Sequence, residues 1–144
     1  MYYIIYVGRK QEYMLEYKEI NLNPKGKKTA DCVIRAISGA TGIDYYKVYE
    51  DLYQISVKTG YMLNEKRCEE KLLEKYNFKK YKQPRKCDGS KYQINELDKL
   101  IDCKKEKVVV SCAHHLTCIK NNKIEDIWDC GSKSVGNYYI LEEK

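Results

Sequence analysis

Three strand-like segments follow one another near the end of the chain, over residues 107–112, 115–120 and 123–129. Asn121 and Asn122 separate the second segment from the third, and asparagine accepts the positive φ angles of a two-residue hairpin turn. With that turn, residue 120 lies opposite residue 123, and each further pair lies one position farther from the turn on both strands. This register decides which side chains share a face of the sheet, so it constrains both the fold and any site built on the hairpin.

The rest of the chain divides into a hairpin, a helical part and a sheet part. Residues 2–7 and 12–20 are strand-like, and a turn between them predicts an N-terminal hairpin within residues 1–20. Apolar residues then recur at helical spacing, which predicts helices over about 31–40, 44–57, from Asn64 onward, and briefly over 94–101. A last strand is expected over 137–141, and residues 77–92 read as irregular. Helices followed by an antiparallel sheet predict one α+β domain, with a helical part at 29–101 and a sheet part at 106–142.

Composition narrows the class of protein. Hydrophobic residues make up 43% of the 144, which is typical of a globular chain. The longest apolar runs are much shorter than the roughly 20 residues of a membrane span. The first run has no basic leader before it, so we do not read it as a signal peptide. We therefore expect a cytoplasmic protein with no membrane partner, whose seven cysteines are reduced thiols.

The formal net charge of +6 comes from lysines that are interspersed with glutamates. The one dense basic segment, residues 79–86, contains an interleaved tyrosine, an arrangement that can bind single-stranded nucleic acid. A solvated loop is the simpler interpretation, so we do not expect a nucleic-acid partner. No segment indicates a cofactor, and the oligomeric state is left open.

Cys32 lies where the first of these helices is expected to begin. If Asp31 caps the helix, the thiol of Cys32 lies near unpaired backbone N–H groups and the positive end of the helix dipole. That environment lowers the pKa of a thiol, and the same N–H groups can bind an oxyanion. Arg35, one turn further on, is expected to be solvated or in an ion pair. The pattern predicts a nucleophilic cysteine, or alternatively a small buried core residue.

The chain has two histidines, His114 and His115, and on a strand they point to opposite faces. The hairpin register places His115 on the same face as Asp126, with Trp128 opposite it. A change of one residue in the turn would pair His115 with Asp129 instead. The sequence therefore predicts His115 with Asp126 as its acid, and Asp129 as the reserve.

Three short segments carry a resemblance to a known class of protein: residues 31–37 with 41–42 and 48–49, then His115-Leu116, then residues 126–129. In this order they resemble small uncharacterised phage and prophage proteins of papain-like, cysteine peptidase-like type. Asp126-Ile127-Trp128 also resembles the Asn-Ser-Trp segment of papain-type proteases. The resemblance implies a papain-like fold in which Cys32 is the nucleophile, His115 the general base and acid, and Asp126 the orienting residue. It also implies that Trp128 shields the histidine from water.

One part of the papain-type pattern is missing. Those enzymes place a glutamine shortly before the nucleophile to complete the oxyanion hole, but residues 25–29 contain neither glutamine nor asparagine. Asn23, or a backbone N–H near Gly26, is expected to serve instead. The resemblance implies a phage-encoded thiol hydrolase of peptidase or amidase type, which forms a thioester and cleaves an amide bond in a host protein or peptide.

Two other classes of function are open at this stage. Cys112, His114 or His115, Cys118 and Cys130 lie close together in the sequence and suggest a structural zinc site, although zinc sites usually use two closely spaced pairs of ligands. A papain-like scaffold can also serve as a non-catalytic module. Such a module would inhibit or sequester a component of host defence through its helices or the basic segment 79–86.

Overall fold

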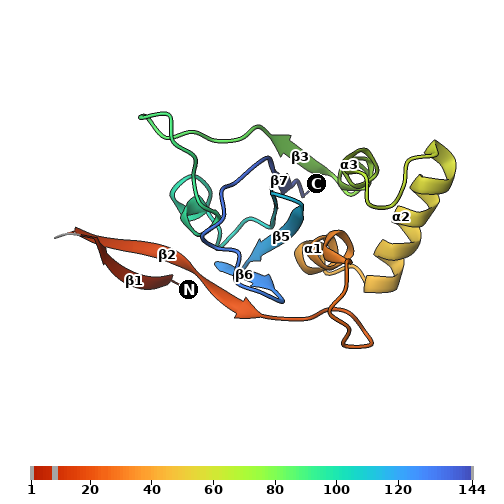
Figure 1. Cartoon of the computed structure of the whole chain (residues 1–144), viewed down its shortest axis with the longest axis horizontal. Helices are drawn as coiled ribbons and strands as arrows, with labels where there is room; N and C mark the ends of the chain where they lie inside the picture. The colour runs from red at the N-terminus through yellow and green to blue at the C-terminus, as the bar shows by residue number, and fades with distance from the viewer. Residues whose placement is uncertain (1, 8–9, 144) are drawn as a thin grey trace.

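The computed structural model describes residues 2–7 and 10–143, and side chains from residue 14 onward. Its helices and strands form an α+β fold (Figure 1). Their bounds are β1 (Tyr2–Val7), β2 (Lys10–Glu19), α1 (Cys32–Thr41), α2 (Tyr45–Thr59), α3 (Lys66–Lys75), β3 (Phe78–Tyr81), the 3-10 helix η1 (Ile94–Lys99), β4 (Val108–Cys112), β5 (His115–Lys120), β6 (Lys123–Asp126) and β7 (Tyr138–Leu141).

The strands form one sheet in the order β1-β2-β6-β5-β4-β7-β3. The expectation of a purely antiparallel sheet is wrong, because β2 pairs with β6 in parallel. The prediction that residues 77–92 form an irregular segment is also wrong for the first part of this range. Residues 78–81 form β3, which pairs with β7 at the edge of the sheet and interrupts the expected helical part. Both corrections concern pairings between segments far apart in the sequence, which local patterns do not reveal.

The register predicted for the hairpin of β5 and β6 is confirmed. Ile119 lies opposite Ile124, and Lys120 lies opposite Lys123. Asn121 and Asn122 have φ angles of 51° and 66°, as the two-residue turn requires. The ladder between the two strands ends at Cys118 and Glu125.

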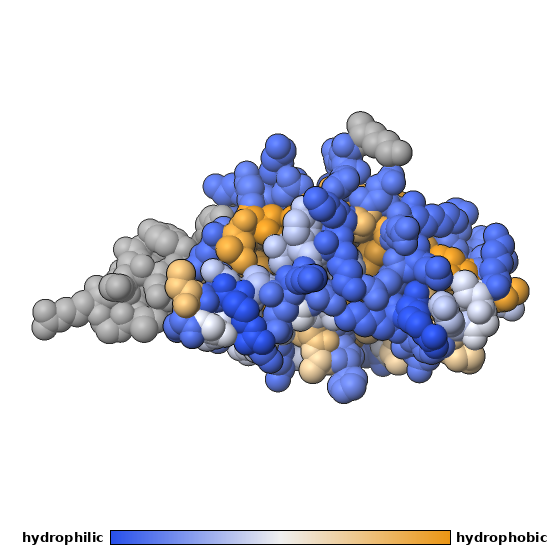
Figure 2. Space-filling view, turned by 90° about the horizontal axis from the view of Figure 1, so that it is seen from above, coloured by the Kyte–Doolittle hydropathy of each residue, from blue (hydrophilic) through white to orange (hydrophobic). Residues whose placement is uncertain are grey.

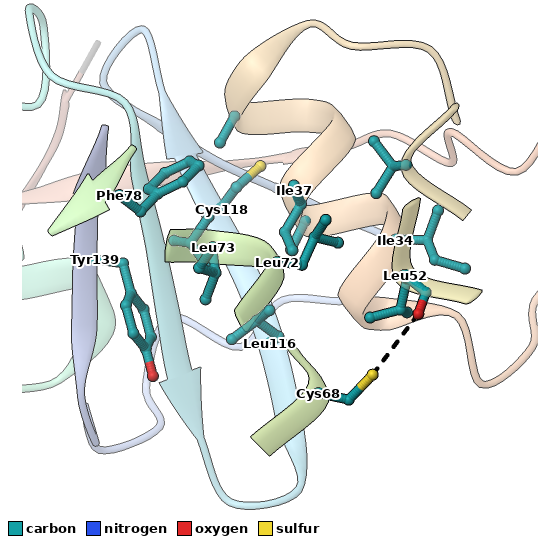
Figure 3. Packing of buried hydrophobic residues seen from close by; sticks show 14 of the residues in the cluster. Ile34, Ile37, Leu52, Cys68, Leu72, Leu73, Phe78, Leu116, Cys118 and Tyr139 are labelled. Atoms are coloured by element: carbon teal, nitrogen blue, oxygen red, sulfur yellow. Dashed lines mark hydrogen bonds between the residues drawn. The ribbon is translucent and has the colours of Figure 1, made fainter. Parts of the chain in front are cut away.

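Both faces of β4 are buried, which explains why this strand is apolar along most of its length. Side chains of one face pack with α1, α2 and α3, which lie together on one side of the sheet (Figure 1). Figure 3 shows this packing, with Leu116 and Cys118 of β5 lying close to Leu72, Leu73 and Ile37 from the helices. Alternate residues of the same strands, such as Ile119 and Ile124, belong to a second cluster that includes η1.

The predicted end of α1 and the predicted cap of α2 are confirmed, whereas the predicted cap of α3 is not. Gly42 ends α1 as expected, with a φ of 78° and an N–H that donates to the carbonyl of Ser38. Asp44 caps α2, and its side chain accepts a hydrogen bond from the N–H of Tyr46. The expected cap at Asn64 is wrong by one residue, because α3 begins after Glu65.

Gly39 sets how closely α1 approaches β5. A Cβ atom built on Gly39 would lie 2.8 Å from the Sγ of Cys118, which is buried. We predict that Gly39→Ala lowers the free energy of unfolding by about 1 kcal/mol, because overpacking outweighs the better helix propensity of alanine. In a Cys118→Ala background the clash is removed, so the same substitution should become stabilising. Chemical denaturation of the four proteins measures both changes, and a loss of equal size in both backgrounds would contradict the close-contact explanation.

The surface seen in Figure 2 is largely hydrophilic, and its apolar areas are small and separated. Over residues 2–7 and 10–143, none of the helices combines the length and the apolar character that crossing a lipid bilayer requires.

Candidate functional site

Cys32 is the first residue of α1, as the sequence predicts. The first backbone hydrogen bond of the helix runs from the N–H of Arg35 to the carbonyl of Asp31, so the N–H groups of the first turn have no partner within the helix. Asp31 does not cap the helix with its side chain, which corrects that part of the expectation. Its carboxylate instead accepts hydrogen bonds from Arg35, Tyr45 and Asn23.

His115 begins β5, and its ring contacts the acid that the register predicts. Nε2 of His115 lies 2.6 Å from Oδ2 of Asp126, and the two side chains are 11% and 1% exposed. The reserve acid, Asp129, has a different partner: its Oδ1 accepts a hydrogen bond from the N–H of Gly131. Of the two candidates, Asp126 is therefore the residue that contacts the imidazole.

Arg35 holds Asp126 in place from the helix. Its Nη1 lies 2.9 Å from Oδ1 of Asp126, while its Nε lies 2.7 Å from Oδ1 of Asp31. The ion-pair reading of Arg35 is confirmed, but the sequence did not identify Asp126 as a partner. The bridge joins the first turn of α1 to the end of β6, and it fixes the acid on the side opposite the histidine. The N–H of Ile127 adds a hydrogen bond of 2.7 Å to the same Oδ1.

The buried charges shift the pKa values of this pair in opposite directions. Burial by itself would raise the pKa of Asp126, but hydrogen bonds from His115, Thr117 and the N–H of Ile127 lower it to about 2. Burial would lower the pKa of His115, but its hydrogen bonds to Asp126, Cys130 and Cys32 raise it to about 11. The stable form is therefore an imidazolium beside a carboxylate.

The thiol of Cys32 belongs to the same network. Burial favours its neutral form, yet the pKa of Cys32 is lowered by hydrogen bonds with His115 and the N–H of Leu116, and by the charges of His115 and Arg35. Since Asp126 binds Nε2 of the imidazole, Nδ1 is the ring nitrogen left for Cys32. The site can therefore hold a thiolate next to an imidazolium.

Two further residues contact His115. The ring of Trp128 lies with its centroid 5.0 Å from that of the imidazole, at an interplanar angle of 54°. Trp128 is 39% exposed, so its ring contacts both the histidine and solvent. Cys130 is fully buried, and its Sγ lies 3.8 Å from Oδ2 of Asp126. Sequence spacing alone did not place Cys130 here, because it follows the end of β6.

Asn23 does not present a free amide at the site. Its Nδ2 donates to Oδ2 of Asp31 at 3.0 Å and lies 3.4 Å from the hydroxyl oxygen of Tyr45. The expectation that Asn23 donates to an oxyanion is thus not supported by its hydrogen bonding. The N–H groups at the start of α1 are better placed beside Cys32 for that task.

The zinc site suggested by the sequence is not assembled. Cys118 packs under the helices, whereas Cys112 and Cys130 belong to the cluster on the other face of the sheet. In the described part of the chain, the group that comes nearest to a metal site is His115, Asp126 and Cys130, whose ligand atoms lie within 4.8 Å of one another. The guanidinium bound to Asp126 already supplies a cation there, so these residues fit an ion-paired network better than a metal.

No protein-family model, curated protein or solved structure matches this chain. A function can therefore be inferred only from the residues and geometry of the site.

Proposed function

We propose that this protein is a thiol hydrolase in which Cys32, His115 and Asp126 act together. The observation that supports this most strongly is the placement of one imidazole, which lies 2.6 Å from a carboxylate and lowers the pKa of a helix-terminal thiol. A nucleophile, a base and a residue that orients the base are the parts that covalent hydrolysis needs. The resemblance to papain-type segments supports a papain-like arrangement, and it is also the basis for proposing a phage origin and a host protein or peptide substrate in the cytoplasm.

The proposed reaction begins when the Cys32 thiolate attacks the carbonyl carbon of an amide. The tetrahedral oxyanion accepts hydrogen bonds from backbone N–H groups at the start of α1, including that of Cys32. His115, protonated at the outset, gives its proton to the departing amine, which leaves a thioester on Cys32. His115 then takes a proton from water, the resulting hydroxide attacks the thioester, and the thiol is released with the carboxylic acid product.

Labelling with a panel of cysteine-directed acyl probes tests this function. We expect the wild-type protein to be acylated at Cys32, as mapped by mass spectrometry, and the thioester to hydrolyse with time. Cys32→Ala should abolish labelling. The matched control is Cys87→Ala, because Cys87 is an exposed free cysteine away from this network, and that variant should label as the wild type does. Acylation of Cys87 in preference to Cys32, or a thioester that never turns over, would favour the non-catalytic binding module instead.

A further inference from the structure

A large cleft opens beside Cys32, and most of its wall is apolar. Its volume is about 890 Å³, and it lies between the start of α1, helices α2 and α3, and the turn that joins β4 to β5. The apolar lining is formed by Val33, Ile34, Tyr45, Tyr49, Leu52 and Leu63. A cleft of this size accommodates a side chain of a bound peptide together with part of its backbone.

One acid that lines this cleft makes no close ion pair with the described residues. Glu69 of α3 lines the cleft and is partly buried, and its burial raises the pKa of the carboxyl to about 7. In the described part of the chain, no hydrogen bond or ion pair to this carboxylate is found. Lys66, one turn earlier on the helix, also lines the cleft, and its charge partly offsets the rise in the pKa of Glu69 without forming a close ion pair. The neighbouring acid differs, since Glu70 pairs with Lys80 at 2.6 Å and accepts from the hydroxyl of Tyr139.

Aromatic rings stand in the same cleft. Tyr45 and Tyr49 meet edge to face with their centroids 6.4 Å apart. The hydroxyl of Tyr45 donates to Asp31 at 2.7 Å, which fixes its ring, and Tyr49 is 44% exposed. Aromatic faces attract ammonium and guanidinium groups, and apolar walls favour an aliphatic stem. The carboxylate of Glu69, which makes no hydrogen bond or close ion pair with the described residues, adds the charge that such a group would pair with.

We infer that this cleft selects substrates with a lysine or arginine close to the bond that is cleaved. The aliphatic stem of the basic residue packs on the apolar wall, and its cationic head pairs with Glu69. The part of this inference that concerns a cleaved bond rests on the proposed hydrolase function. The preference of the cleft for basic residues can hold without any reaction.

Binding of blocked tripeptides to the Cys32→Ala protein tests the preference without any catalysis. The set carries lysine, arginine, norleucine or glutamate at each of the three positions in turn, and affinity is measured by calorimetry. At one position at least, we expect lysine and arginine to bind about tenfold more tightly than norleucine, equivalent to one partly buried charge pair. Glu69→Gln should remove this ratio and leave norleucine binding unchanged, while Glu70→Gln should keep the ratio.

Equal affinity for lysine and norleucine at every position, or a ratio that survives Glu69→Gln, would overturn the inference. The same tripeptides, made as activated thiol-reactive esters, then report acylation of Cys32 in the wild-type protein. Basic peptides that bind selectively but never acylate Cys32 would refute the hydrolase and keep the basic-residue cleft. Acylation without a basic preference would refute the cleft and keep the hydrolase.

Discussion

Replacing His115 with asparagine should lower the rate of Cys32 acylation by about three to four orders of magnitude. The imidazolium stabilises the thiolate and supplies the proton to the leaving group, and general acid–base catalysis of this kind contributes about 10²- to 10⁴-fold. Loss of the thiolate adds to that factor at neutral pH. The measurement is single-turnover acylation by the best acyl probe, followed by mass spectrometry of the intact protein.

His114 provides the matched control, since it is the same residue type one position away. It is exposed, lies in the turn between β4 and β5, and has a φ of 54°, which asparagine tolerates well. His114→Asn should therefore acylate within about threefold of the wild-type rate, a range typical of surface changes. Equal losses in both variants would mean that the turn, and not the imidazole of His115, is responsible.

Replacing Arg35 with methionine should destabilise the protein more than any other single change at the site. The variant removes the cation that bridges the buried carboxylates of Asp31 and Asp126, and Asp126 keeps its contact with His115. Removing one partner from a buried ion pair costs about 3–5 kcal/mol. Chemical denaturation at pH 7 measures the loss. Arg67→Met is the control, because Arg67 is 63% exposed and pairs with Glu65 at the surface, where an ion pair contributes under about 1 kcal/mol.

The pH dependence of this loss has a definite sign. Burial by itself would raise the pKa of Asp31, but the hydrogen bond from Arg35 helps to lower it below its ordinary 3.8, so this stabilisation is complete above about pH 4. It is lost as the pH falls through the lowered pKa of Asp31, below which the carboxyl is protonated in both states. The difference in unfolding free energy between wild type and Arg35→Met should therefore be full at pH 7 and shrink below pH 4. A difference that stays constant down to pH 2 would show that methionine disturbs packing instead of charge.

The sequence contains enough information to place His115 next to Asp126. Two asparagines mark a two-residue turn, and a strand alternates its side chains, so register and face follow without knowledge of the rest of the fold. The start of α1 at Cys32 is equally local, because apolar residues at helical spacing begin there. Local rules of this kind account for the elements of the site and for the α+β class. The catalytic roles assigned to these residues remain predictions.

Local sequence patterns could not predict the contacts between segments that are distant in the sequence. Nothing in residues 12–20 indicates that β2 pairs in parallel with β6, and nothing in residues 78–81 indicates a partner in β7. Arg35 and Asp126 are 91 positions apart, and their ion pair depends on where α1 crosses the sheet. That crossing depends on close packing at Gly39, a small residue that carries no pattern of its own. The hydrogen bonds of Asn23 escaped prediction for the same reason, since its partners Asp31 and Tyr45 come together only in the fold.

The ionisation of Cys32 tests the central claim most directly. Thiolate absorbance near 240 nm can be followed against pH, with Cys32→Ala subtracted to remove the other six cysteines and the tyrosines. We predict that the Cys32 thiolate forms below the ordinary thiol pKa of about 8.5, because its pKa is lowered by His115 and Arg35. The Cys32 thiolate and the His115 imidazolium then coexist at pH values above the lowered pKa of Cys32 and below the raised pKa of His115. In His115→Asn the titration should move upward. A Cys32 that titrates in the ordinary range in the wild type, or whose titration does not change in His115→Asn, would contradict the account.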